Sequence, residues 1–120
     1  MITEENIRQM VTHFYHNVRQ DGLLNPIFAA QIRDEEWPHH LERMCDFWSS
    51  VLLTTGRFHG NPRAVHAQLA DITPEHFDRW LQLFERTLEN TFDNETAAGI
   101  LDRARRMRFV LQSASCPLHV

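Results

Sequence analysis

Two histidines, His40 and His66, lie in surroundings that could hold a metal cofactor. His66 lies in a short polar segment that follows Gly60 and Pro62, whereas His40 lies in a long aromatic-rich stretch with helical spacing. Ferrous iron needs one neutral imidazole donor and an open sixth position to bind a diatomic gas. A histidine on a brief constrained turn, facing a second histidine on a helix, could hold an iron porphyrin between two walls. Taken alone, however, a histidine in a polar loop is usually just solvated.

The elements that must position these histidines are helices, because apolar residues recur every three or four positions along nearly the whole chain. Thr3 is a suitable N-cap for the first helix, and Thr73-Pro74-Glu75 combines an N-cap, a first-turn proline and an acid that the helix dipole favours. We predict helices over about residues 3–19, 38–53, 74–91 and 93–111. Between them we expect a short turn at 25–28, a polar loop at 33–36 and a glycine-containing loop at 54–62.

The apolar face of the second long helix is unusually broad for a surface helix. Its apolar residues are Trp37, Leu41, Met44, Cys45, Phe47, Trp48, Val51 and Leu52. A face of this width requires burial on more than one side, so a cofactor could cover part of it. The chain as a whole is expected to be a single all-α domain, residues 1–120, with a frayed tail from about residue 112.

Composition excludes several classes of partner. The 120 residues are 42% hydrophobic and carry a net charge of −4, and no basic run exceeds Arg105-Arg106, so nothing indicates binding to nucleic acid or an anionic membrane. Cys45 and Cys116 supply neither a disulfide framework nor paired zinc ligands. The first residues are polar and no apolar run reaches membrane-spanning length, so we expect a soluble, cytoplasmic protein.

Several motifs, in one consistent order and spacing, resemble a known family, the truncated haemoglobins, and most closely its third group. They are Phe14-Tyr15, Pro26-Ile27-Phe28, His40 with Phe47-Trp48, the glycine-rich loop, His66, and Phe77-Asp78-Arg79-Trp80-Leu81. The likeness covers about residues 4–108. It implies a two-over-two helical sandwich, a shortened globin in which the helix before the proximal histidine is mostly a loop.

The resemblance also implies roles for the polar residues. His66 matches the proximal iron ligand, and Tyr15, His40 and Trp80 match the distal polar positions, where any catalytic role would lie. Iron-bound oxygen has partial superoxide character, which the Tyr15 hydroxyl and the Trp80 indole N–H could stabilise by donating hydrogen bonds. His40 could also move outward as a gate or coordinate the iron itself.

Other residues would hold the cofactor. Phe28 matches the aromatic residue that wedges against the porphyrin, and Arg43 lies one helical turn after His40, where the family often places a cation for a haem propionate. The predicted apolar lining consists of Phe14, Phe28, Met44, Phe47 and Phe77. Because the chain has no Cys-x-x-Cys-His motif, the haem would be non-covalent haem b.

The expected function is binding of oxygen and other small ligands, such as nitric oxide, carbon monoxide, cyanide or peroxide, at the haem iron. Two distal donors predict slow ligand release, which suits detoxification, redox chemistry or sensing better than bulk oxygen transport. The reaction stays open between nitric oxide dioxygenase-like and peroxidase-like activity. We expect a monomer, served by an unidentified reductase if it turns over.

Two rival functions predict different features. A cofactor-free helical interaction module would have a packed core with no cavity between the proximal and distal residues. A carboxylate-bridged di-iron protein would need two Glu-x-x-His motifs on facing helices, but the chain offers only Glu36-x-x-His39, which Pro38 interrupts.

Overall fold

The computed structural model describes residues 1–58 and 73–115, and their side chains as far as Met107. Its elements in chain order are α1 (Glu4–Gln20), α2 (Asn25–Gln31), the short 3₁₀ helix η1 (Asp34–Glu36), α3 (Trp37–Leu53), α5 (Pro74–Thr91) and α6 (Asn94–Ser115). All the regular elements of the described residues are helical, which confirms the predicted all-α class. None of the described helices combines the length and the apolar composition that crossing a membrane requires.

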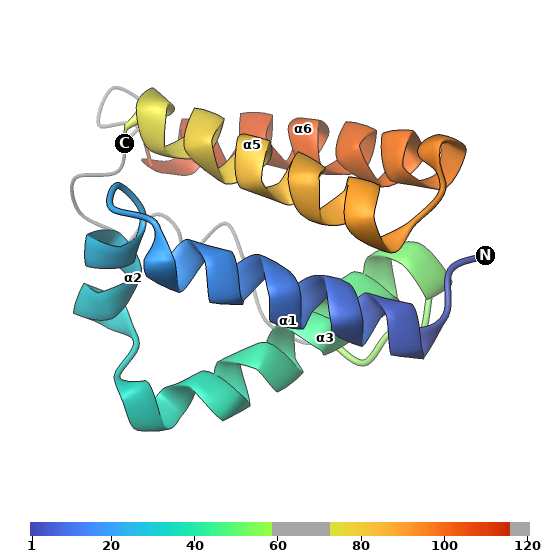
Figure 1. Ribbon diagram of the computed structural model, residues 1–120, viewed down its shortest axis with the longest axis horizontal. Coiled ribbons are helices and arrows are strands. Elements are labelled where there is room, and N and C mark those ends of the chain that lie inside the picture. The colour runs from blue at the N-terminus through green and yellow to red at the C-terminus, as the bar shows by residue number, and fades with distance from the viewer. Residues whose placement is uncertain (59–72, 116–120) are drawn as a thin grey trace.

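Helix α1 is the central element of the fold. It packs against both α3 and α5, and α5 packs in turn against α6. In Figure 1, α1 therefore lies between α3 on one side and the pair α5 and α6 on the other. Its buried residues follow the helical repeat of the sequence and are Ile7, Met10, Val11, Phe14, Tyr15 and Val18. This arrangement places the end of α1, where Phe14 and Tyr15 lie, next to α2, α3 and α5.

Local hydrogen bonds explain where the long helices begin. The Asn6 backbone N–H donates to Thr3 Oγ1 at 3.2 Å, and the Thr3 N–H donates to Asn6 Oδ1 at 2.7 Å, a reciprocal capping arrangement at the predicted N-cap. At α6 the Asp93 carboxylate accepts the Thr96 N–H at 2.9 Å. These pairs are three residues apart in sequence, which is why a sequence pattern can predict them.

Two short elements differ from the sequence prediction. The segment expected to be a short turn is the seven-residue helix α2, which begins after the Asp21 carboxylate accepts the N–H groups of Leu23 and Leu24 at 3.1 and 3.0 Å. The expected polar loop at 33–36 contains η1, where the Arg33 N–H donates to Glu36 Oε1 at 2.9 Å. Both are held by carboxylate side chains that accept backbone N–H groups two or three residues away, a signal that apolar periodicity does not contain.

The final helix also extends further than expected. We predicted the last helix to end at about residue 111, and the backbone of α6 is helical to Ser115. Residues 116–120 lie outside the described part of the chain, as do residues 59–72 between α3 and α5.

Candidate functional site

Tyr15 is the centre of an aromatic wall that three helices build together. Its ring on α1 is 7% exposed and lies against four neighbouring rings, with centroid separations of 4.9 Å to Phe14, 6.0 Å to Phe28, 5.8 Å to Trp37 and 5.1 Å to His40. Phe28 comes from α2, and the last two come from the first turn of α3. The structure therefore brings together Tyr15, His40 and Phe28, which the sequence analysis had assigned to one site.

His40 presents a polar atom inside this wall. Its Nε2 atom is fully buried, and its ring meets Tyr15 at an interplanar angle of 85° and Trp37 at 87°. Such edge-to-face contacts hold a ring at a set angle, and they are favourable beyond the area they bury. The imidazole is thus held in an apolar setting, where hydrogen bonds are stronger than in water.

Burial also sets the protonation state of Tyr15. Desolvation raises the pKa of the Tyr15 hydroxyl well above its ordinary value of 10, because the phenolate would lose its hydration inside the wall. The side chain is therefore a neutral phenol throughout the physiological pH range. A neutral phenol can donate a hydrogen bond to a ligand that carries negative charge, whereas a phenolate cannot.

Trp80, the third predicted distal residue, is joined to Tyr15 through Phe14. The Trp80 indole on α5 stacks on Phe84 with centroids 5.2 Å apart and planes inclined by 17°, and it meets Phe14 edge to face at 5.3 Å. Phe14 and Phe84 also contact each other at 5.1 Å. The Trp80 ring is thereby held on two sides while the residue remains partly exposed.

The remaining predicted lining residues lie on α3 and α5. Met44 and Phe47 are half-buried and pack on the edge of the core, and Phe77 is buried. Arg43, the predicted propionate ligand, places its guanidinium carbon 5.4 Å from the centre of the Phe58 ring. Phe47 meets the same Phe58 ring at 5.1 Å, so these two residues share a neighbour just before the chain enters residues 59–72.

His66, the predicted iron ligand, lies outside the described residues. Within the described part of the chain, no three His, Cys, Asp or Glu side chains gather closely enough to hold a metal ion. The assignment of His66 as the proximal ligand therefore stays a prediction.

Trp37 is a member of the wall that the sequence analysis missed as a site residue. It is 4% exposed, and its ring lies 5.2 Å from His40 and 6.4 Å from Phe28 as well as against Tyr15. The Arg19 guanidinium carbon lies over the Trp37 ring, 4.7 Å from the ring centre. The signal was present in the sequence, because positions three apart on a helix share a face and Trp37 precedes His40 by one turn.

The chemistry of this wall fits a haem group. A porphyrin needs a broad apolar surface, and a small ligand on its iron needs one or two donors inside that surface. Aromatic rings from α1, α2 and α3 supply the apolar surface, while the Tyr15 hydroxyl and a buried imidazole nitrogen of His40 supply polar atoms within it.

Comparisons with known proteins agree with this geometry. A family model described as "Bacterial-like globin" matches residues 2–113. The chain is 38% identical over 106 residues to the group 3 truncated haemoglobin Ctb of Campylobacter jejuni, covering 87% of this chain and 84% of that protein. It also matches the crystal structure of a group III truncated haemoglobin from Campylobacter jejuni with a TM-score of 0.92 and 34% identity, over 98% of this chain and 94% of that one. The chain therefore belongs to the bacterial-like globins, as a truncated haemoglobin of group III.

Proposed function

We propose that this chain binds haem b through His66 and uses it to bind oxygen and other small ligands on the side where Tyr15, His40 and Trp80 lie. The observation that carries the proposal is the buried contact between Tyr15 and His40, at 5.1 Å within a wall of aromatic rings. Family membership supports it, because a globin implies a haem cofactor and small-ligand binding. When bound, haem supplies the iron that takes the ligand.

The tyrosine hydroxyl is the principal donor in this proposal. Because burial keeps Tyr15 protonated, it donates to the ligand atom that gains negative charge, and the surrounding rings exclude the water that would compete. The four ring contacts hold the phenol in one orientation, so little entropy is lost when the hydrogen bond forms.

His40 and Trp80 complete the polar side of the pocket. Trp80, stacked on Phe84, has its orientation set by a ring in the centre of the core and acts as a second donor. His40 places a buried nitrogen next to Tyr15, where it would serve either as a further polar group toward the ligand or as a ligand of the iron itself.

Phe14, Phe28, Met44, Phe47 and Phe77 form the apolar lining of the proposed pocket. Arg43 is exposed on α3 and serves as the cation for a haem propionate. Slow ligand release, which two donors produce, suits detoxification, sensing or redox chemistry of the nitric oxide dioxygenase or peroxidase type better than oxygen delivery. Turnover then requires a reductase, and the protein acts as a monomer in the cytoplasm.

Absorption spectra test the proposal directly. Purified protein is mixed with hemin and recorded in the ferric, dithionite-reduced and carbon monoxide-bound forms, for the parent chain, for His66→Ala, and for His16→Ala as a control at an exposed position on α1. We expect a sharp Soret band that shifts with carbon monoxide in the parent and in His16→Ala, and that is lost or grossly altered in His66→Ala. Absence of specific haem uptake would favour the cofactor-free interaction module, whereas a spectrum indifferent to His66 would remove this residue as the iron ligand.

A further inference from the structure

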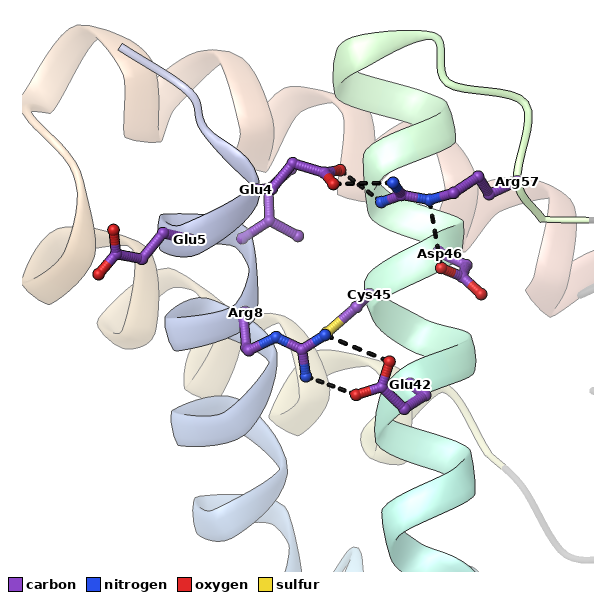
Figure 2. Close-up of a pocket in the computed structure, with 8 residues that line it drawn as sticks. Glu4, Glu5, Arg8, Glu42, Cys45, Asp46 and Arg57 are labelled. Atoms are coloured by element: carbon purple, nitrogen blue, oxygen red, sulfur yellow. Dashed lines mark hydrogen bonds and ion pairs between the residues drawn. The ribbon is translucent and has the colours of Figure 1, made fainter.

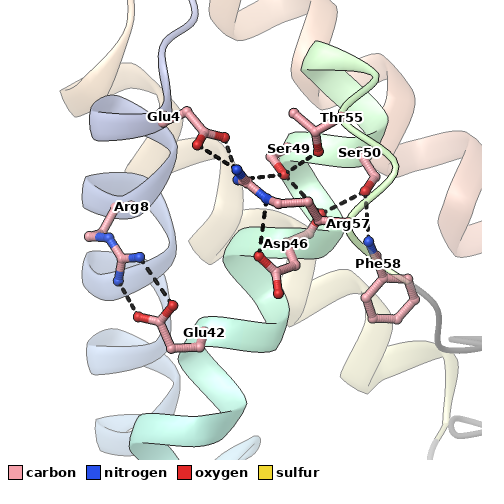
Figure 3. Close-up of polar contacts among 9 residues, drawn as sticks. All are labelled: Glu4, Arg8, Glu42, Asp46, Ser49, Ser50, Thr55, Arg57 and Phe58. Carbon is pink, nitrogen blue, oxygen red and sulfur yellow. Dashed lines mark hydrogen bonds and ion pairs between the residues drawn. The ribbon is translucent and has the colours of Figure 1, made fainter.

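The segment that follows α3 turns back along the helix it has just left. Thr54 caps α3 in the left-handed conformation with φ of 56°, and Gly56 again has a positive φ of 71°. Glycine adopts this region at little cost, whereas threonine does so only where its surroundings compensate. Residues 54–58 therefore lie beside the last turns of α3, as Figure 3 shows, and their path needs contacts that hold it.

Arg57 provides the largest set of these contacts. Its guanidinium binds both carboxylate oxygens of Glu4, at 2.7 Å from Nη1 to Oε2 and through a second, shorter contact from Nη2 to Oε1. It also lies 3.4 Å from Asp46 Oδ1 through Nε and 3.0 Å from Ser49 Oγ through Nη2. Figures 2 and 3 show the guanidinium between the start of α1 and the face of α3, at one end of an open pocket. We call Glu4, Asp46, Ser49 and Arg57 the Arg57 clasp.

Two serines of α3 also bind residues on either side of Arg57 in the segment 54–58. Ser49 is 1% exposed, and its hydroxyl lies 2.8 Å from Thr55 Oγ1 as well as accepting from Arg57. Ser50 Oγ accepts the backbone N–H of Phe58 at 3.0 Å. Two consecutive side chains of α3 therefore bind three of the five residues in the segment 54–58.

These contacts fix the last described residue before the stretch that contains His66. The Phe58 backbone N–H donates to Ser50 Oγ, and the centroid of the Phe58 ring lies 5.1 Å from that of Phe47. At the other end, the Thr73 N–H donates to His76 Nδ1 at 2.9 Å. Both described residues that flank residues 59–72 are thus held by side chains of the adjoining helices.

We propose that Arg57 is a positioning residue for the haem ligand: the Arg57 clasp fixes the path by which the chain leaves α3 and so restricts where the following stretch can place His66. The inference rests on the proposed function of His66. A histidine bound to iron must meet the metal at a set distance and angle, and anchoring the chain upstream reduces the entropy lost when it does so. The clasp acts through the backbone and does not touch the cofactor.

The chain offers a matched control, because a second arginine joins the same two helices. Arg8 on α1 binds both carboxylate oxygens of Glu42 on α3, at 2.6 and 3.2 Å. Its exposure is similar, 56% and 58% for the Arg8–Glu42 side chains against 46% and 53% for Arg57–Glu4. Arg57 is itself part of the segment 54–58, whereas the Arg8–Glu42 pair includes no residue of that segment. Removing Arg8 therefore weakens the joint between α1 and α3 without releasing that segment.

The experiment compares Arg57→Met with Arg8→Met, both of which keep a long apolar side chain and remove the guanidinium. The first measurement is hydrogen exchange of the Phe58 amide in the haem-free protein. The second is the rate of haem transfer from each ferric holoprotein to an excess of apomyoglobin, and the third is the iron–histidine vibration of the reduced protein by resonance Raman spectroscopy.

We expect Arg57→Met to speed both Phe58 amide exchange and haem loss by about tenfold. The guanidinium is bonded to the buried Ser49 hydroxyl as well as to two carboxylates, and the loss of one net hydrogen bond of a charged group has about this effect. The iron–histidine band should broaden or shift. Arg8→Met should change each rate less than about twofold, as is usual for an exposed ion pair. Arg57→Lys, which keeps the charge but not the fork of donors, should restore little.

Equal effects of Arg57→Met and Arg8→Met on the three measurements would overturn the inference, because the clasp would then only join two helices. If Arg57→Met fails to fold by circular dichroism, Glu4→Gln, which removes the carboxylate charge from the clasp and keeps Arg57, decides the matter by the same two rates. Failure of the parent chain to bind haem would overturn the proposed function and this inference with it, whereas normal haem binding with unchanged rates would overturn this inference alone.

Discussion

Tyr15→Phe isolates the contribution of one hydroxyl to ligand binding. The substitution removes the donor and keeps the ring, so the contacts at 4.9 Å with Phe14 and 5.1 Å with His40 are retained. The change in protein stability should therefore be small, and any effect on ligand kinetics should come from the lost hydrogen bond. The buried phenol is protonated at neutral pH, so the parent protein has its donor available throughout.

The size of the effect follows from the setting of the hydroxyl. A hydrogen bond to a charged group contributes about 1.5–3 kcal/mol, and each 1.4 kcal/mol corresponds to about a tenfold change in rate or affinity. Because Tyr15 is only 7% exposed, little water is available to replace the lost donor. Oxygen dissociation should therefore be about 10- to 100-fold faster in Tyr15→Phe.

Stopped-flow displacement of oxygen by carbon monoxide measures this rate, and carbon monoxide itself is the internal control. Bound carbon monoxide carries less negative charge than bound oxygen, so its own dissociation rate should change far less in the variant. An oxygen dissociation rate within about twofold of the parent would refute the role of Tyr15 as the principal donor. Such a change in rate is smaller than the change expected from losing a net hydrogen bond to a charged group. An equal increase in the dissociation rates of oxygen and carbon monoxide would instead indicate that the ring at position 15 had moved.

Two further predictions concern stability. Phe84 is 1% exposed and packs on Phe14, Trp80 and the Trp48 ring at 5.2 Å, so Phe84→Ala should lower the free energy of unfolding by about 3–5 kcal/mol in urea titration of the haem-free protein; a loss below about 1 kcal/mol would contradict the core position. The hydrogen bond from Arg57 lowers the pKa of Glu4 from its ordinary value of 4.5, so the carboxylate contributes stability that is present above that value and is lost as the pH falls through the lowered pKa. The urea midpoint of the parent should therefore exceed that of Glu4→Gln at pH 6, and the difference should disappear as the pH falls below the lowered pKa of Glu4; a pH-independent difference would argue against the ion pair.

Much of the fold could be predicted from sequence because its causes are local. The helix starts at Thr3 and Asp93 depend on hydrogen bonds between residues three apart, and the buried face of α1 follows from a repeat of three or four residues. Prediction from the local pattern failed at α2, where it indicated only a turn. The structure has a seven-residue helix there, and Phe28 on this helix contacts Tyr15 and Trp37 of other helices.

For the candidate site, too, some features could be predicted from the sequence and others could not. The sequence by itself, through the order and spacing of its motifs, determined the family and the identities of Tyr15, His40 and Trp80 as candidate polar residues. Only the tertiary structure decided that the Tyr15 and His40 rings lie in contact and that Trp37 belongs to their wall. It alone also revealed that Arg57 binds Glu4. The physical reason is that side chains from different helices meet according to how those helices pack, and residues as far apart as Glu4 and Arg57 have no spacing rule that would predict their contact.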